Sequence, residues 1–207
     1  MNQADVAAVA AAITLPAIGA PFRGGFFTGV IVVNGQRRAL ITAGAEGELK
    51  GKWNESLATV SGATSRADGM ANTKAMAEAG SELAQQALAL SIGGHADWYI
   101  PSKDEQELQH RVFKPTTRKN WDDRDNGINP SSLPVGEAYT ANYPLQTTVE
   151  NFRAGGPDAF EPDWYWSSTQ HAVLPGTAWL QGFGNGGQGC YHESYAGRAR
   201  AVRSEPI

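Results

Sequence analysis

Cysteine is almost absent from this sequence: Cys190 is the single one among 207 residues. A lone cysteine excludes an intrachain disulfide, a metal site made of several cysteines, and any catalysis that needs a cysteine pair. Cys190 could still serve as a free thiol nucleophile, but no local signature around it supports that role.

Basic charge and long apolar runs are also scarce. The formal net charge of −4 argues against non-specific binding of nucleic acid, which requires a basic field. The apolar stretch at residues 6–15 is too short to cross a bilayer. Asp5 stands where a signal peptide carries positive charge, and Pro21 follows the best small-residue cleavage site. We therefore expect neither membrane insertion nor a signal peptide.

Glycine and tryptophan are abundant, with 24 and 6 residues, which favours a loop-rich fold held by aromatic anchors. The hydrophobic fraction of 41% and the charged fraction of 18% are those of a soluble globular chain. The length fits one domain with a short appendage. We assign the alanine-rich residues 1–21 to an N-terminal arm or docking segment, in which residues 4–13 can form a short helix. Residues 22–207 form the domain.

The first half of the domain carries the signals of a hairpin followed by a helix. Asn34-Gly35 separates two β-rich runs, 26–33 and 38–43, and is the strongest short-range hairpin signal. Apolar residues at helical spacing predict a helix over residues 68–90 that is interrupted at Gly80.

A second helix is predicted over residues 102–113. Ser102 and Glu105 have the spacing of a capping box, and Pro115 ends the helix. The carboxylates of Asp104, Glu105 and Glu107 would suit acid–base chemistry. Acidic residues in a first helical turn ordinarily complement the helix dipole, and we expect that structural role here.

Residues 114–147 form a long loop region with four prolines. A loop of this length within a domain is usually functional or ordered by its own packing. Asp122, Asp123 and Asp125, followed by Asn126-Gly127, suggest a calcium site. The glycine falls one position early for a helix–loop–helix calcium site, and no glutamate follows at the required distance. A solvated turn is the default expectation, a different calcium geometry stays open, and no other cofactor or metal is expected.

The C-terminal residues 164–203 organise the rest of the chain. Three short strand-like runs separated by glycine-rich or mixed loops predict an antiparallel sheet of hairpins. In the last of them, RARAVR, alternation places Arg198, Arg200 and Val202 on one face.

The strand TAWLQGF decides which residues this segment displays. Alternation places Trp179 and Phe183 on one face and Leu180 and Gly182 on the other. We expect Trp179 and Phe183, together with Trp164 or Trp166, to be buried beneath a displayed face that carries Leu180.

Catalysis is not expected. His95, Asp97 and Glu161 are the side chains that could be assembled into a hydrolytic site, but no nucleophile motif and no metal-ligand spacing accompanies them.

A family resemblance adds to these expectations. The ordered segments NGQRRALITA, DGMANTKAM, SIGGHADWYIPSKDEQEL, NPSS, YWSST, AWLQGF and RARAVR resemble C-type-lectin-like domains of phage tail proteins and bacterial surface proteins. The C-terminal domain of the Legionella collagen-like adhesin is one of these. The resemblance covers residues 26–207. It implies an α+β, C-type-lectin-like fold in which two helices pack on a small twisted antiparallel sheet with long loops.

The resemblance also implies a binding function for the C-terminal segment. The chain is similar to phage proteins whose C-terminal segment is diversified by retroelements, in which an evolved face is rewritten while the fold stays fixed. Glu161-Pro162-Asp163 resembles one of the two calcium and sugar motifs of C-type lectins, but the second is missing, so calcium-dependent sugar binding is not expected. The residues expected to bind a receptor are Val173, Leu174, Thr177, Leu180, Gly182, Gly184, Gly187, Gly189, Tyr191, His192, Ser194 and Tyr195.

The resemblance thus favours a non-enzymatic receptor-binding protein at the tail or fibre tip of a phage virion. Such a protein is made in the host cytoplasm, acts outside the cell, and contacts a protein or glycan on the host surface. Other phage tail proteins are expected partners, and a homo-oligomer is expected, with a trimer favoured. The alternative is a structural virion protein, a tail-assembly or decoration subunit whose lectin-like face binds another phage protein.

Overall fold

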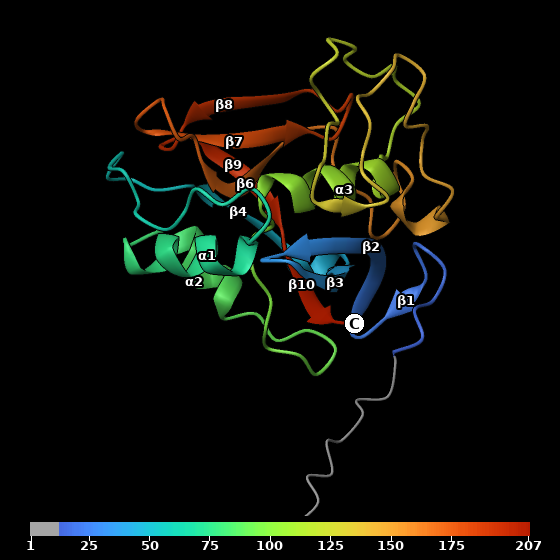
Figure 1. Ribbon diagram of the computed structural model, residues 1–207, viewed down its shortest axis with the longest axis horizontal. Coiled ribbons are helices and arrows are strands. Elements are labelled where there is room, and N and C mark those ends of the chain that lie inside the picture. Colours follow the sequence, from blue (N-terminus) through green and yellow to red (C-terminus); the bar gives the residue numbers. More distant parts are fainter. Residues whose placement is uncertain (1–12) are drawn as a thin grey trace, which may run out of the picture.

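The computed structural model describes residues 13–207 and is an α+β fold with two sheets and three α-helices (Figure 1). The predicted helix at residues 4–13 falls almost wholly outside the described residues. The strands are β1 (Pro21–Phe22), β2 (Gly25–Val33), β3 (Gln36–Thr42), β4 (Glu48–Lys52), β5 (Ser132–Leu133), β6 (Trp164–Gln170), β7 (Thr177–Gly182), β8 (Gln188–His192), β9 (Ala196–Arg200) and β10 (Val202–Pro206). The helices are α1 (Gly69–Glu78), α2 (Glu82–Leu88) and α3 (Lys103–Phe113), with short 3₁₀ turns at Ala45–Gly47 and Glu150–Phe152.

The first sheet is built on the predicted hairpin. Strands β2 and β3 pair antiparallel, and both turn residues have positive φ, 51° at Asn34 and 78° at Gly35. This left-handed backbone is the conformation that an Asn-Gly hairpin turn requires. The sheet order is β1-β2-β3-β10, with β5 also paired to β2. The hairpin prediction is confirmed.

The second sheet has the order β4-β9-β6-β7-β8. Its pairs are antiparallel except for β6 and β9, which meet in parallel at Tyr165 and Arg198. The alternation predicts that the RARAVR run forms one strand, but the structure divides the run between two strands. Arg198 and Arg200 belong to β9 in this sheet, whereas Val202 opens β10 in the first sheet. The expectation that Val202 shares a face with these arginines is therefore wrong, because the chain changes sheets at Ala201.

The predicted helix at 68–90 is two helices. Gly80 has φ of 90° and separates α1 from α2, and each begins at a side-chain cap, Asp68 for α1 and Ser81 for α2. Left-handed backbone ends a helix, and glycine adopts it without strain. Both helices cover the second sheet, where α1 contacts β6 and α2 contacts β4 (Figure 1). The core between them contains Trp53, Trp166, Met76, Leu83 and Leu180.

Helix α3 connects the two sheets, since it contacts β2 and β5 of the first and β6 and β7 of the second. It begins at the predicted capping box: Ser102 Oγ accepts from the N–H of Glu105, and Glu105 Oε2 accepts from the N–H of Ser102 at 2.8 Å. The helix and its cap are confirmed.

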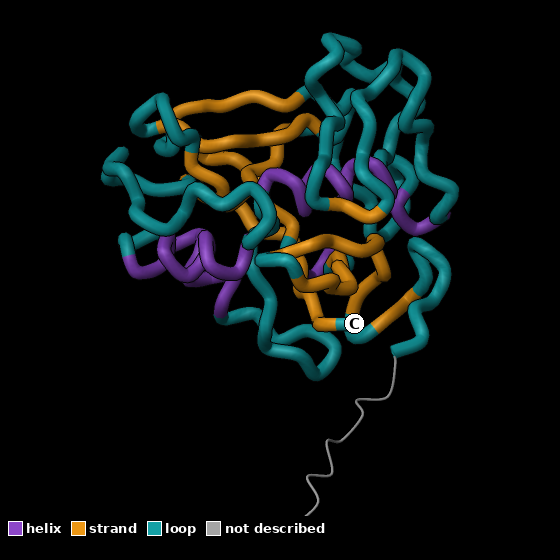
Figure 2. The backbone as a smooth tube through the Cα atoms, viewed as in Figure 1, coloured by secondary structure: helices purple, strands orange, loops and turns teal. Residues whose placement is uncertain are grey.

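The long loop region after α3 is ordered by a buried lysine. Lys114 Nζ donates to the carbonyl oxygens of Arg118 and Pro144 and to Asn120 Oδ1, at 2.6–3.2 Å. Three acceptors saturate an ammonium group, so one side chain fixes several turns of otherwise irregular backbone. In Figure 2 these loops are the teal segments at the upper right, beside α3.

Candidate recognition surface

Strand pairing decides which face of β7 is buried. Leu180 lies opposite Trp166 of β6 and Gly189 of β8, and it is only 7% exposed because it joins the core beneath α1 and α2. Trp179 points to the other face and is half-buried. The expectation of a displayed Leu180 over a buried Trp179 is therefore wrong. Phe183, which follows the strand, is buried as predicted, stacked on Phe160 at 4.0 Å between ring centroids.

A cavity of about 380 Å³ opens on the Leu180 side of the second sheet. Three aromatic side chains stand around it, with exposed fractions of 40% for Trp164, 55% for Tyr191 and 39% for Tyr195. Leu180, Gly189 and Cys190 complete the lining. We call these six residues the aromatic cavity. None of them carries a formal charge, so the cavity suits an uncharged apolar group.

A buried tryptophan supports the aromatic cavity from below. Trp166 is fully buried and packs edge-on against the ring of Tyr195 at 6.2 Å between centroids. Its indole N–H donates to the carbonyl oxygen of Tyr195 at 3.3 Å. Tyr195 in turn meets Tyr191 edge-on at 5.2 Å. The ring of Tyr195 is therefore held by the core and that of Tyr191 by Tyr195, which reduces the side-chain freedom that these two lose when a partner binds.

Four glycines of segment 182–189 have backbone conformations that any residue can adopt. Gly182, Gly184, Gly187 and Gly189 all lack the positive φ that favours glycine, whereas Gly186 in the same hairpin has φ of 76°. A Cβ on Gly189 would meet nothing within 4 Å, and one on Gly187 would make ordinary contacts from 3.5 Å outward. Side chains can thus be added on this face without moving the chain.

The remaining predicted site residues lie elsewhere on the segment. Val173 and Leu174 belong to the β6–β7 connection, and Thr177 begins β7. His192 ends β8 and Ser194 follows it, and both are exposed. Gly184 faces Pro162 and Arg118 instead of the cavity. Of the twelve predicted residues, the structure places Leu180, Gly189, Tyr191 and Tyr195 in the lining and Gly182 and Gly187 against the ring of Trp164.

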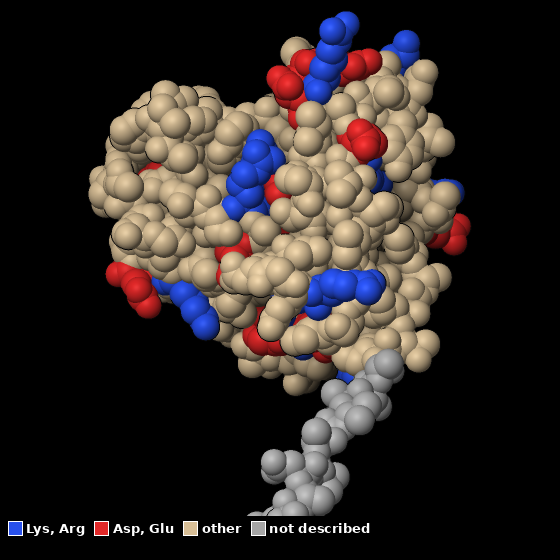
Figure 3. All heavy atoms as spheres, in the orientation of Figure 1, with Lys and Arg blue, Asp and Glu red and all other residues tan. Residues whose placement is uncertain are grey.

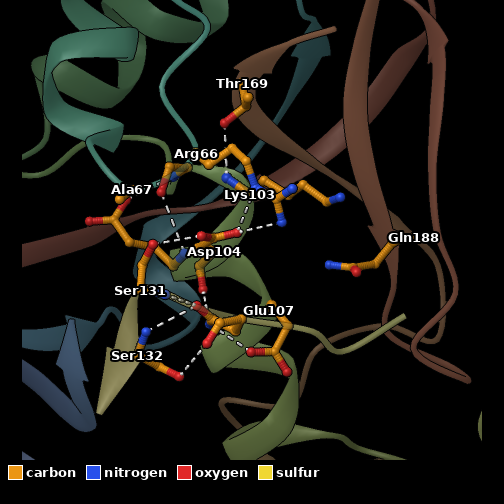
Figure 4. A network of polar contacts seen from close by, with 12 residues as sticks. Arg66, Ala67, Lys103, Asp104, Glu107, Ser131, Ser132, Thr169 and Gln188 are labelled. Carbon is orange, nitrogen blue, oxygen red and sulfur yellow. Dashed lines mark hydrogen bonds and ion pairs between the residues drawn. The ribbon is translucent and has the colours of Figure 1, made fainter. Parts of the chain in front are cut away.

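Sequence reasoning missed the burial of the acidic residues of α3. Asp104, Glu105 and Glu107 are all fully buried. Figure 4 shows the network that surrounds the first of them: Asp104 Oδ1 accepts from Arg66 and Asp104 Oδ2 accepts from Ser131 Oγ at 2.7 Å. A buried carboxylate is tolerated only with such partners. These hydrogen bonds join α3 to distant segments of the chain, a role that is different from the complement to the helix dipole expected from the sequence.

The same network continues one turn further along α3. Glu107 accepts from Asn129, Arg111 and the hydroxyl of Tyr139, at 2.7–2.9 Å. Burial raises the pKa of the Glu107 carboxyl. Burial also lowers the pKa of His110, whose Nδ1 lies 3.0 Å from the same Tyr139 hydroxyl, to about 3. This histidine is therefore neutral at physiological pH, and it is enclosed by Phe183 and Gly186.

Of the side chains considered for a hydrolytic site, Asp97 is already paired. Asp97 pairs with Arg203 through two hydrogen bonds of 2.7 and 2.9 Å, and Glu161 is exposed. In the proposed calcium loop, Asp123 Oδ1 accepts from the backbone N–H groups of Asp125 and Asn126, which is the hydrogen bonding of a tight turn. Among residues 13–207, no group of three or more His, Cys, Asp or Glu side chains is arranged to hold a metal ion.

Within the same described range, no helix is both long enough and apolar enough to span a membrane. No protein-family model matches this chain, and no curated protein matches it either.

Proposed function

We propose that this protein is a non-enzymatic receptor-binding component of a phage virion, with a C-type-lectin-like fold. Its aromatic cavity contacts a protein or glycan on the host surface. The observation that carries the proposal is the cavity itself: three exposed aromatic side chains around an uncharged hollow, supported by the buried Trp166. Aromatic residues held rigidly around a desolvated centre are typical of binding hot spots.

The backbone of the neighbouring glycines supports the same proposal. A recognition face that changes between variants needs positions where side chains can differ while the strands stay in place. Gly187 and Gly189 meet that requirement in both φ and space. The resemblance of the C-terminal segment to retroelement-diversified proteins fits this property. We propose that the protein acts outside the cell as a homo-oligomer that is joined to other tail proteins. A trimer is the oligomer that we favour.

The proposal is tested by filling the cavity. Gly189→Leu places a side chain into open space at a position with unrestricted backbone, so it should fold normally and occlude the cavity. Tyr191→Ser removes one of the three exposed rings. We expect particles carrying either variant to assemble, and to adsorb to their host at least about tenfold more slowly, since losing a central aromatic contact costs about 2 kcal/mol or more. Normal adsorption by folded, assembled variant particles would refute the proposal.

A second apolar surface favours the alternative function, a structural virion subunit. A cavity of about 440 Å³ lies between α3 and the loop around β5, and the exposed side chains Ile18, Leu133, Val135 and Tyr143 line it. Tyr143 is 53% exposed, nearly the same as Tyr191, so Tyr143→Ser is a matched control. Loss of particles with Tyr143→Ser would assign this second surface to assembly. Loss of particles with Tyr191→Ser would favour the structural function for the aromatic cavity.

A further inference from the structure

On the opposite face of β7, a lysine of α3 lies against Trp179. Lys103 Nζ stands 3.6 Å above the ring centroid of Trp179, and His171 stacks on the same indole at 5.1 Å with an interplanar angle of 25°. Lys103 is half-buried. Within residues 13–207, its ammonium group makes no hydrogen bond and no ion pair, although such groups carry three donors. The aromatic face is therefore its closest favourable contact, and the carboxylates of Asp104 and Asp125 attract it from beyond ion-pair distance.

The carboxylate next to it in sequence is already used. Asp104 Oδ1 accepts from Arg66 Nε and Nη2 at 3.3 and 3.1 Å, and Asp104 Oδ2 accepts from Ser131. Arg66 remains 51% exposed in its side chain, so it can receive a second acceptor from solution. Two cations, Lys103 and Arg66, thus lie beside one enclosed carboxylate. The carboxylate accepts hydrogen bonds from Arg66 and Ser131 and not from the ammonium group of Lys103.

Basic side chains are grouped on this face of the molecule. Figure 3 shows basic side chains gathered over the first turn of α3, between the β7–β8 hairpin and the loops that follow α3. Figure 4 shows Lys103 and Arg66 side by side above Asp104, with the amide of Gln188 pointing toward them from β8. The amide nitrogen of Gln188 donates to Gln181 Oε1 at 3.4 Å, so the donors that face this space come from Lys103 and Arg66.

The backbone of the helix start does not contribute donors to this space. The N–H groups of Lys103 and Asp104 donate to Thr169 Oγ1 and to the carbonyl oxygen of Arg66, each at 2.9 Å, and that of Glu105 is capped by Ser102. Binding of a ligand at this surface would therefore depend on side chains alone.

We propose that Lys103 and Arg66 bind the acidic group of a ligand, a carboxylate, sulfate or phosphate, with the indole of Trp179 as the wall of the subsite. A bound oxyanion would give the ammonium the acceptors that it lacks, and charge-assisted hydrogen bonds are the strongest available to it. Burial, together with the charge of Arg66, lowers the pKa of Lys103 to about 8. The group is still mainly protonated at neutral pH and is ready to pair. This subsite lies on the face of β7 opposite to Leu180, and Cys190, which pairs with Trp179, adjoins both it and the aromatic cavity.

The test begins with the unmodified chain. Acetate, sulfate and inorganic phosphate are titrated separately while the side-chain resonances of the lysines are followed by NMR. We expect at least one anion to shift the Lys103 resonance saturably and to raise its pKa, because a bound anion favours the charged form. The exposed Lys74 serves as the internal control and should not respond. The anion with the highest affinity identifies the chemistry of the acidic group. Absence of a saturable shift at Lys103 with all three anions would overturn the proposal.

Variants give a second, independent measurement by calorimetry. Lys103→Met keeps the packing of the side-chain stem on Trp179 but removes the charge, and Lys74→Met is the matched control. We expect Lys103→Met to weaken anion binding by about tenfold or more and Lys74→Met to leave it unchanged. Arg66→Gln, at a half-exposed position, should weaken anion binding as well. If Lys103→Met does not fold, the affinity of Arg66→Gln for the anion tests the proposal in its place. Equal affinity in the native protein and in folded Lys103→Met would contradict the assignment.

Discussion

Two tryptophans in β6 offer a sharp test of the architecture. Trp164 and Trp166 are two residues apart and share one face of the strand, but Trp166 is fully buried and Trp164 is 40% exposed. Trp166 also packs directly on Gly197, since its Nε1 atom lies 2.7 Å from where a Cβ would stand on that glycine. We predict that Trp166→Ala destabilises the protein strongly and that Trp164→Ala does not.

The magnitude follows from the enclosed space that the indole fills. Truncating a buried tryptophan costs about 3–5 kcal/mol, part of it for the cavity left behind, and the lost hydrogen bond to Tyr195 contributes about 1 kcal/mol to that figure. For a chain of this size, the expected fall in melting temperature is about 10 °C. Trp164→Ala leaves no enclosed cavity and should cost about 1–2 kcal/mol.

The assay is urea unfolding followed by circular dichroism, with calorimetric melting as a check. The aromatic cavity supplies a second measurement, because Trp166→Ala should also loosen Tyr195 above it, which fluorescence quenching of the tyrosines detects. Equal losses of stability in the two variants would mean that the assigned faces of β6, and with them the floor of the cavity, are incorrect.

Two further predictions concern a buried acid and a turn. Burial raises the pKa of the Glu105 carboxyl from 4.5 to about 7, so the folded state holds a proton that the unfolded chain has released. The stability that this proton contributes is fully present below pH 4.5, the ordinary pKa of the carboxyl, and is lost as pH rises through about 7. Glu105→Gln should therefore remove the difference between the free energies of unfolding that urea denaturation gives at about pH 5 and about pH 8. In the β7–β8 turn, Gly186→Ala should cost more than about 1 kcal/mol, because its φ is 76° and a Cβ would come within 2.8 Å of Tyr139 and His110. Gly189→Ala should stay within about 0.5 kcal/mol in the same denaturation assay, and similar losses in both would refute the assignment of φ.

The features that could be predicted from sequence are those that depend on neighbouring residues. The Asn34-Gly35 turn, the break at Gly80 and the box between Ser102 and Glu105 each need only a few adjacent positions, because the backbone conformation and its hydrogen bonds are satisfied locally.

The features that could not be predicted depend on distant partners. Trp179 and Leu180 are both apolar, so alternation alone could not say which faces the core; the choice is made by the pairing of Leu180 with Trp166. The burial of Glu107 likewise depends on Asn129 and Tyr139, which come from loops far along the chain. In the candidate site, the aromatic members Tyr191 and Tyr195 were foreseen as exposed. Trp164 at the rim was foreseen only as a support, and the unpaired Lys103 on the other face was not foreseen.

The placement of the C-terminal strand has a mechanical consequence. Strand β10 is joined to β3 through five successive residue pairs, from Val202 with Thr42 to Pro206 with Arg38. The described chain also enters through this first sheet, and both of its ends lie on the side of the molecule away from β8 (Figure 1). A pulling force applied between the two ends is therefore borne in shear by the ladder of β2, β3 and β10. Strands β6, β7 and β8 lie off this line of tension and keep their shape while the molecule is under load.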